Sequence, residues 1–202
     1  MAERATLLPI RATPYPGAMT GDFSRKPTLT GDRVVLRPFR EDDNPAIATA
    51  LQDLEVIRLT GSEPLTWDEA AEQKLRDWYA ARNTQPDRLD LAIEDRATGQ
   101  WVGEVVLYEV DIRNANCTFR TLIGPSGRDR GLGSEALRLL LPYAFTTLAL
   151  HRIELHVFDF NPRARRVYEK AGFQVEGIQR EVLRTPDGWA DAVQMAILNP
   201  DR

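Results

Sequence analysis

The sequence predicts one α/β (α+β) domain, built on a mixed sheet with helices on its faces. The chain has 202 residues, which is the size of a single domain. Hydrophobic residues make up 43% and charged residues 28%, a composition that is typical of globular proteins and excludes extensive disorder. The segments follow the order strand, two helices, three strands, helix, strand, helix and two strands, and this order predicts helices packed on a sheet.

The first 27 residues show no helical or strand periodicity and are rich in proline and glycine. We expect residues 1–27 to form a flexible tail and residues 28–202 to form the domain. An arm that crosses onto a partner subunit is the alternative for this tail. The first strand is predicted at Arg33–Arg37, a β-rich segment that ends at Pro38.

Two helices are predicted after this strand. The first starts near Asp42, has Pro45 in its first turn and runs to about Leu54. The second opens with the capping box Thr66-Trp67-Asp68-Glu69 and runs to about Arg82.

Three strands follow beyond Pro86, at about 89–94, 101–109 and 117–123, and are expected to form an antiparallel meander. Gly124-Pro125-Ser126-Gly127 then breaks the chain. Apolar residues at helical spacing predict a helix from about Gly131 to 148, with a kink at Pro142.

In the last third of the chain, the sequence predicts a strand, a helix and two further strands. A strand is expected from His151 to Phe158 and a helix from Asn161 to Ala171, which Gly172 would end. Two further strands, at about 174–183 and 189–198, flank the turn Pro186-Asp187-Gly188.

Charge and cysteine content exclude several classes of protein. The formal net charge of −4 gives no global positive field for nucleic acid. Cys117 is the sole cysteine, which excludes an intramolecular disulfide and every multi-cysteine metal motif, and we expect it to be a packed thiol. His151 and His156 lie five residues apart and would face opposite sides of a strand, so no metal site is expected. No apolar run approaches about 20 residues, and we therefore expect a cytoplasmic protein without nucleic-acid or membrane partners.

The most informative segment is Arg128-x-x-Gly131-x-Gly133, which lies between a predicted strand and a predicted helix. A helix start offers free backbone N–H groups, and glycine lets a bulky anion approach the backbone, so this segment predicts a phosphate site. A glycine-rich turn with solvated arginines is the alternative. The Walker loop is excluded because no lysine follows Gly133, and the dinucleotide fingerprint because three strands without helices precede the segment.

With this loop and a second motif in the correct order, the chain resembles the GNAT superfamily of N-acetyltransferases. The second motif is Asn161-x-x-Ala164-x-x-x-Tyr168-Glu169-Lys170-x-Gly172-Phe173. The resemblance covers about Leu29 to the C-terminus. It is closest to the branch that acetylates the N-termini of ribosomal proteins, because of Leu36-Arg37-Pro38, Gly131-Leu132-Gly133-Ser134-Glu135-Ala136, His151-Arg152-Ile153 and Val175-Glu176-Gly177.

The resemblance implies the GNAT fold, in which a mostly antiparallel sheet has helices on both faces and two splayed strands form the acyl-CoA cleft. It implies acetyl-CoA as co-substrate, with the pantetheine between these strands and the pyrophosphate on the loop. The implied cofactor-binding residues are Leu122, Ile123, Gly124, Arg128, Arg130, Gly131, Leu132, Gly133, Ser134, Asn161, Ala164 and Tyr168. Asn161 could instead be only a helix cap, and Tyr168 only a half-buried aromatic.

Acyl transfer to an amine needs a neutral nucleophile, a stabilised oxyanion and a proton for the thiolate. Tyr168 is the expected general acid. Glu104, on a central strand, is the expected base, acting directly or through water, and a solvated strand residue is the alternative. Glu109 and Asp111 are weaker candidates for the base.

These inferences predict an N-acetyltransferase that moves an acetyl group from acetyl-CoA to a primary amine in a ternary complex. The expected acceptor is a protein N-terminal α-amine. The protein could form a homodimer. The alternatives are a small amine, such as a polyamine, or a non-catalytic acyl-CoA sensor. Four basic residues of the predicted helix after Asn161 are expected to face solvent, although they could meet the 3′-phosphate of CoA: Arg163, Arg165, Arg166 and Lys170. Three aromatic residues of the second predicted helix are expected to pack in the core, although they could shape the acceptor pocket: Trp67, Trp78 and Tyr79.

Overall fold

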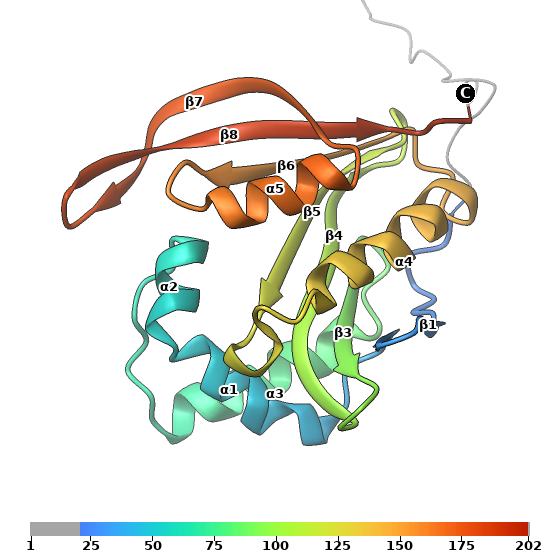
Figure 1. The fold of residues 1–202 in the computed structure, drawn as a ribbon. Coiled ribbons are helices and arrows are strands. Elements are labelled where there is room, and N and C mark those ends of the chain that lie inside the picture. Colours follow the sequence, from blue (N-terminus) through green and yellow to red (C-terminus); the bar gives the residue numbers. More distant parts are fainter. Residues whose placement is uncertain (1–20, 202) are drawn as a thin grey trace, which may run out of the picture.

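The computed structural model describes residues 21–201, which form an eight-stranded sheet in the order β1-β2-β3-β4-β5-β6-β8-β7 (Figure 1). The strands are β1 (Leu29–Thr30), β2 (Val34–Arg37), β3 (Leu89–Asp95), β4 (Gln100–Asp111), β5 (Asn116–Ile123), β6 (Arg152–Phe158), β7 (Gln174–Thr185) and β8 (Gly188–Leu198). The pair β5–β6 is parallel, and all other pairs in this sheet are antiparallel. The predicted mixed, mostly antiparallel sheet is confirmed.

Within the described residues, five helices accompany this sheet. They are α1 (Asn44–Leu51), α2 (Leu54–Thr60), α3 (Glu69–Arg82), α4 (Leu132–Thr146) and α5 (Pro162–Lys170), with short 3₁₀ turns at Glu41–Asp43 and Pro125–Gly127. On one face, α4 and α5 pack on the larger core, in which Leu137 and Leu140 of α4 are fully buried. On the other face, α1 and α3 pack on a smaller core around Trp101. Both layers bury apolar helix faces against the sheet.

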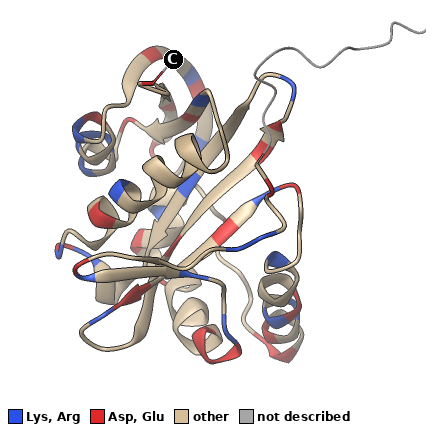
Figure 2. Ribbon diagram, turned by 90° about the vertical axis from the view of Figure 1, so that its right-hand side faces the viewer, with Lys and Arg blue, Asp and Glu red and all other residues tan. Residues whose placement is uncertain are grey.

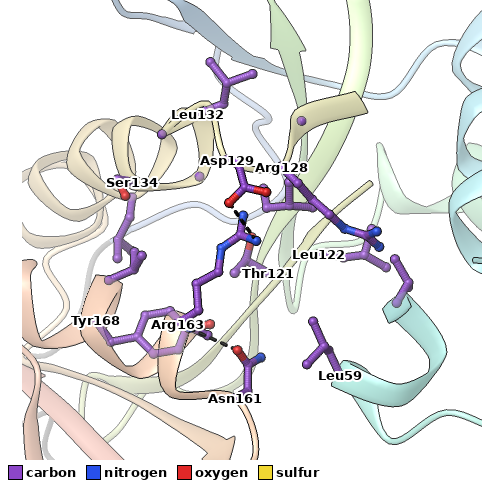
Figure 3. A pocket seen from close by; sticks show the side chains of 18 of the residues that line it. Leu59, Thr121, Leu122, Arg128, Asp129, Leu132, Ser134, Asn161, Arg163 and Tyr168 are labelled. Carbon is purple, nitrogen blue, oxygen red and sulfur yellow. Dashed lines mark hydrogen bonds and ion pairs between the residues drawn. The ribbon is translucent and has the colours of Figure 1, made fainter. Parts of the chain in front are cut away.

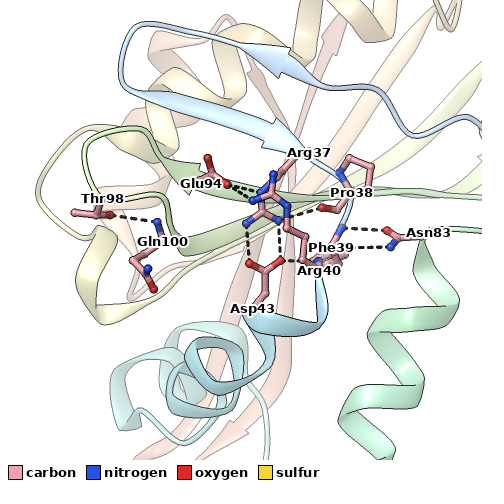
Figure 4. Close-up of polar contacts among 9 residues, drawn as sticks. All are labelled: Arg37, Pro38, Phe39, Arg40, Asp43, Asn83, Glu94, Thr98 and Gln100. Atoms are coloured by element: carbon pink, nitrogen blue, oxygen red, sulfur yellow. Dashed lines mark hydrogen bonds and ion pairs between the residues drawn. The ribbon is translucent and has the colours of Figure 1, made fainter.

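A buried ion-pair cluster joins the 3₁₀ turn after β2 to the sheet (Figure 4). Arg37 is 3% exposed and donates two hydrogen bonds of 2.7 Å to the carboxylate of Asp43. Its Nε also donates to Glu94 of β3 at 2.5 Å. Because a bidentate guanidinium–carboxylate pair has a fixed geometry, this cluster sets the turn between β2 and α1.

The structure corrects the predicted helix boundaries. The first helix ends at Leu51 instead of Leu54, and the separate helix α2, which was not predicted, begins after Asp53. The Asp53 side chain caps α2 by accepting a hydrogen bond of 2.9 Å from the Val56 N–H. Helix α3 starts at Glu69 because Asp68, and not Thr66, is its N-cap, accepting from the Ala71 N–H at 2.8 Å. The two-residue strand β1 was also missed.

The predicted tail, residues 1–27, lies mostly outside the described residues. Its last residues pack on the domain, since Phe23 is 3% exposed within the larger core. The Lys26 ammonium group donates hydrogen bonds to the carbonyl oxygens of Phe23 and Gln85, at 2.9 and 2.8 Å. The packed region therefore begins before residue 28.

Acidic and basic residues are interspersed on several of the helices (Figure 2). In the part of the chain that the structure describes, no helix has the length and apolarity needed to cross a membrane.

Candidate active site

Strands β5 and β6 pair over only three residues and then separate. Asn116–Thr118 of β5 pair with Arg152–Glu154 of β6. Beyond this point β5 continues along β4 to Ile123, and β6 continues along β8 to Phe158. The sheet therefore splits between two neighbouring strands, as the GNAT resemblance implies.

A cavity of about 290 Å³ lies at this split (Figure 3). Its lining includes most of the predicted cofactor residues, namely Leu122, Ile123, Arg128, Gly131, Leu132, Gly133, Ser134, Asn161, Ala164 and Tyr168. Segments that are far apart in the sequence, the end of β5, the start of α4 and one face of α5, therefore meet around one cavity. Binding of CoA by these residues stays a prediction.

The loop before α4 has the backbone geometry that an anion requires. Gly131 is the N-cap of α4 in the left-handed conformation, with φ of 69°, and no side chain caps the helix. The N–H groups of the first turn of a helix have no partner within that helix, and the helix dipole favours negative charge there. At Gly133 an added Cβ would come within 3.1 Å of Ile123, inside the cavity wall. The loop thus fits a pyrophosphate held by backbone groups.

The two loop arginines differ in their partners. Arg128 lines the cavity and pairs with Asp53 and Glu55 at the start of α2. Arg130 does not line this cavity, because its guanidinium turns to Asp95 at 2.7 Å, on the other side of the loop.

Gly124 also lies outside the lining. Its N–H donates to the Val102 carbonyl oxygen at 2.9 Å, and an added Cβ would meet the Trp101 ring at 3.1 Å. Its backbone N–H is therefore used within the protein, and Leu122 and Ile123 are the members of this strand end that reach the cavity.

Helix α5 presents Asn161, Ala164 and Tyr168 to the cavity. The Asn161 side chain accepts a hydrogen bond of 3.1 Å from the Ala164 N–H, so Asn161 is the helix cap and also a lining residue. The Tyr168 ring is 8% exposed and packs edge-on against Phe119, with centroids 6.1 Å apart. Burial raises the pKa of the Tyr168 phenol well above its usual value, so the phenol stays protonated at neutral pH, as a proton donor must.

Glu104 is not among the residues that line the cavity. Its carboxylate is 3% exposed and accepts hydrogen bonds from the Tyr79 hydroxyl at 2.9 Å and from Arg120 at 3.0 Å. Burial raises the pKa of Glu104, against the opposing effects of Arg120 and Tyr79, and a higher pKa makes a carboxylate a stronger base. A catalytic role for Glu104 stays a prediction.

The weaker candidates for the base have partners of their own. Glu109 accepts a hydrogen bond from the Thr118 hydroxyl at 3.0 Å, and Asp111 accepts from the Asn114 side chain at 2.6 Å. Cys117 is buried, and burial raises the pKa of its thiol to about 12. The expectation of a packed thiol at this position is confirmed. Among residues 21–201, no three His, Cys, Asp or Glu side chains converge to hold a metal ion.

The aromatic residues of the second predicted helix have different surroundings. Tyr79 is buried and Trp67 packs against the smaller core, as expected. Trp78 is 50% exposed, and the Arg82 guanidinium stacks over its ring at 3.6 Å from the centroid. The expectation that Trp78 packs in the core is wrong, because it lies on the outer face of α3.

One wall of the cavity was not predicted from the sequence. That wall is α2, which contributes Glu55, Val56, Leu59 and Thr60. The signal was an aspartate, Asp53, directly before a short apolar segment, which is a typical helix start. Arg163 is exposed, as expected, and it also lines the cavity and pairs with Asp129 at 3.1 Å.

Comparisons with known proteins agree with this geometry. Residues 33–174 match the family described as Acetyltransferase (GNAT) domain. The probable N-acetyltransferase YjcK of Bacillus subtilis is 36% identical, over 86% of this chain and 98% of its own length. Human alpha/beta-tubulin-N-acetyltransferase 9 is 30% identical, over 72% of this chain and 74% of its own. The structure of spermidine N-acetyltransferase from Vibrio cholerae in complex with CoA and spermine superposes with a TM-score of 0.74 at 26% identity, covering 84% of this chain and 97% of that chain.

Proposed function

Because this chain belongs to the acetyltransferase (GNAT) family and is an acetyl-CoA-dependent N-acetyltransferase, we propose that its acceptor is the α-amine of a protein or peptide N-terminus. The acetyl group would pass directly from acetyl-CoA to this amine in a ternary complex. The branch of the family that acetylates ribosomal-protein N-termini is the one whose short motifs this sequence resembles.

The observation that carries this proposal is the charge balance of the cavity. Two carboxylates line it, and each has an arginine partner: Glu55 pairs with Arg128 at 2.7 Å, and the exposed Asp129 pairs with Arg163 at 3.1 Å. The ammonium groups of a polycation would compete with these arginines for the two carboxylates. An α-amine has a pKa near 8 and is partly neutral at pH 7, whereas a lysine-like amine has a pKa near 10.4. An α-amine therefore needs the least help from the site to lose its proton before it attacks the thioester.

Different residues would bind the cofactor and transfer the protons of the reaction. The loop of Gly131, Leu132 and Gly133 would hold the pyrophosphate, and Leu122 and Ile123 the pantetheine. The bound thioester supplies an electrophilic carbonyl carbon and a thiolate leaving group. Tyr168 would donate its phenolic proton to that thiolate. Because Glu104 is not among the residues that line the cavity, we propose that it takes the proton of the amine through water.

A small-molecule amine is the second candidate acceptor. It is favoured by the likeness to spermidine N-acetyltransferase of Vibrio cholerae, whose structure contains CoA and spermine. In this reading the acidic residues at the mouth of the cavity would exchange their arginine partners for ammonium groups of the substrate.

An acceptor panel decides between these two candidates. Peptides with a free N-terminus, the same peptides with a blocked N-terminus, and spermidine would be compared at saturating acetyl-CoA, with release of the CoA thiol as the readout. The proposal expects kcat/KM for the best free peptide to exceed that for spermidine by at least about tenfold, or roughly 1.4 kcal/mol, and no turnover of blocked peptides. The reverse order would assign a small-molecule acceptor.

A further inference from the structure

Helix α2 is attached at its N-terminal end to the predicted phosphate loop. Arg128 of that loop pairs with Asp53, the N-cap of α2, and its Nη1 lies 2.7 Å from Glu55 Oε2. The Arg128 side chain is 15% exposed, so solvent screens these pairs less than it screens a surface pair. The hydrogen bond from Arg128 lowers the pKa of Asp53, which keeps the acid charged.

The C-terminal end of α2 is attached to the opposite side of the split. Gly61, the C-cap, has φ of 66°, and a Cβ there would lie 3.0 Å from the Phe158 ring of β6 and 3.2 Å from Leu183 of β7. Next to this contact, the Arg58 guanidinium stacks over Phe160, 5.1 Å from the ring centroid. Helix α2 therefore spans the mouth of the cavity, from the phosphate loop to β6.

The face of α2 that lines the cavity contains none of the residues predicted to bind the cofactor. Val56, Leu59 and Thr60 line the cavity from this side. The other walls are the end of β5, the loop with the start of α4, and α5, which together carry the residues predicted to bind acetyl-CoA. An acceptor amine that reaches the thioester would therefore contact α2.

The partners of Arg128 also bear on how the loop would bind a phosphate. Each terminal nitrogen of its guanidinium is paired with an acid, Nη2 with Asp53 and Nη1 with Glu55, so the two carboxylates hold the guanidinium toward the start of α2. The backbone N–H groups at the start of α4 lack such partners and are the groups that suit a pyrophosphate.

We propose that Asp53, Glu55 and Arg128 form a positioning cluster that fixes α2 as the acceptor wall, and that the Arg128 side chain does not bind the pyrophosphate. This inference rests on the proposed acetyl transfer to an amine. Loss of the cluster then weakens acceptor binding and leaves CoA binding unchanged.

The test compares Arg128→Met with the double variant Asp53→Asn/Glu55→Gln. Asparagine is also a good N-cap, so the double variant removes charge and keeps the cap of α2. For both variants we expect the acceptor KM to rise at least about tenfold, while kcat and the CoA Kd from calorimetry change less than about threefold. Combining all three substitutions should add little, because residues of one cluster are not additive.

The matched control is Glu69→Gln, an exposed acid in the first turn of α3. It should leave the acceptor KM and the CoA Kd at the values of the unmodified protein. Hydrogen exchange of the backbone amides in residues 54–60 provides a readout that needs no acceptor, and exchange there should speed up in the two cluster variants and not in the control.

Two results would overturn the proposal. A CoA Kd that weakens tenfold in Arg128→Met, or that tightens in Asp53→Asn/Glu55→Gln, would make the Arg128 side chain a phosphate ligand that the two acids restrain. Unchanged exchange in α2 would show that the cluster does not hold the helix. If the unmodified protein acetylates no amine, the proposed function fails, whereas the exchange and CoA measurements still decide the role of the cluster.

Discussion

Tyr79 on α3 donates its hydroxyl hydrogen to Glu104 on β4 across 2.9 Å, within the interface between helix and sheet. Arg120 of β5 donates to the other carboxylate oxygen at 3.0 Å. A carboxylate that is buried with one partner on each oxygen is held in a single orientation. The contacts with Tyr79 and Arg120 therefore fix the direction in which the Glu104 carboxylate could accept a proton.

Glu104→Gln tests the proposed base. If Glu104 accepts the amine proton through water, kcat/KM of the variant should show its largest deficit at low pH, where the amine is charged, and the deficit should shrink as pH rises. A pH–rate profile of both proteins, measured with the same acceptor, checks this. A deficit that does not change with pH would make Glu104 a structural residue.

A pH series of unfolding free energies provides the matched control for this variant. Burial raises the pKa of Glu104 above 4.5, so the folded protein binds this proton more tightly than the unfolded chain. The contribution of Glu104 is then fully present below about pH 4.5 and is lost as pH rises through the raised pKa. The stability of the unmodified protein relative to Glu104→Gln should fall in that direction.

Gly133→Asp tests the phosphate loop. A side chain at this position would meet Ile123 at 3.1 Å and add negative charge beside the pyrophosphate site. Calorimetry should show a CoA affinity reduced at least about tenfold, or roughly 1.4 kcal/mol. The control is Gly177→Asp in β7, where an added Cβ meets nothing within 4 Å. Equal CoA affinities for the two folded variants would remove the loop from the site.

Asp43→Asn tests the buried cluster at Arg37. The substitution leaves Arg37, which is 3% exposed, with Glu94 as its remaining acid partner among the described residues. Breaking a buried pair in this way costs roughly 3–5 kcal/mol of unfolding free energy, which denaturant titration would measure. Glu72→Gln, which breaks the exposed pair with Arg76 at 3.6 Å, should cost less than about 0.5 kcal/mol. Similar losses in both variants would contradict the structural role of Arg37.

Patterns that depend on local spacing were predictable from the sequence. The strand boundaries around residues 89–123 agree with the structure within about two residues, because apolar alternation and turn residues determine them. The loop of Gly131 and Gly133 and the face of Asn161 and Tyr168 were brought to one cavity as expected. The local conformation of each motif is determined by its own residues, and the order of the strands and helices then places the two motifs at the same cavity.

Features that depend on tertiary contact were not predictable in this way. Helix α2 has only seven residues, and its place at the cavity depends on Arg128 and Phe158, which are distant in sequence. An isolated helix of this length is unstable in water. The opposite orientations of Arg128 and Arg130 likewise depend on Asp53 and Asp95, which no pattern within the loop contains.

The proposed reaction depends on proton donation by Tyr168 inside the cavity, and Tyr168→Phe removes only the hydroxyl group that donates this proton. The most direct measurement is the single-turnover rate of the variant at saturating acetyl-CoA, together with its Kd for the cofactor. We predict a rate lower by about 10² to 10⁴-fold, the range of general acid catalysis, with a Kd that stays close to the original value. A Tyr168→Phe enzyme that turns over at nearly the original rate would contradict this role and leave the Tyr168 hydroxyl without a part in the chemistry.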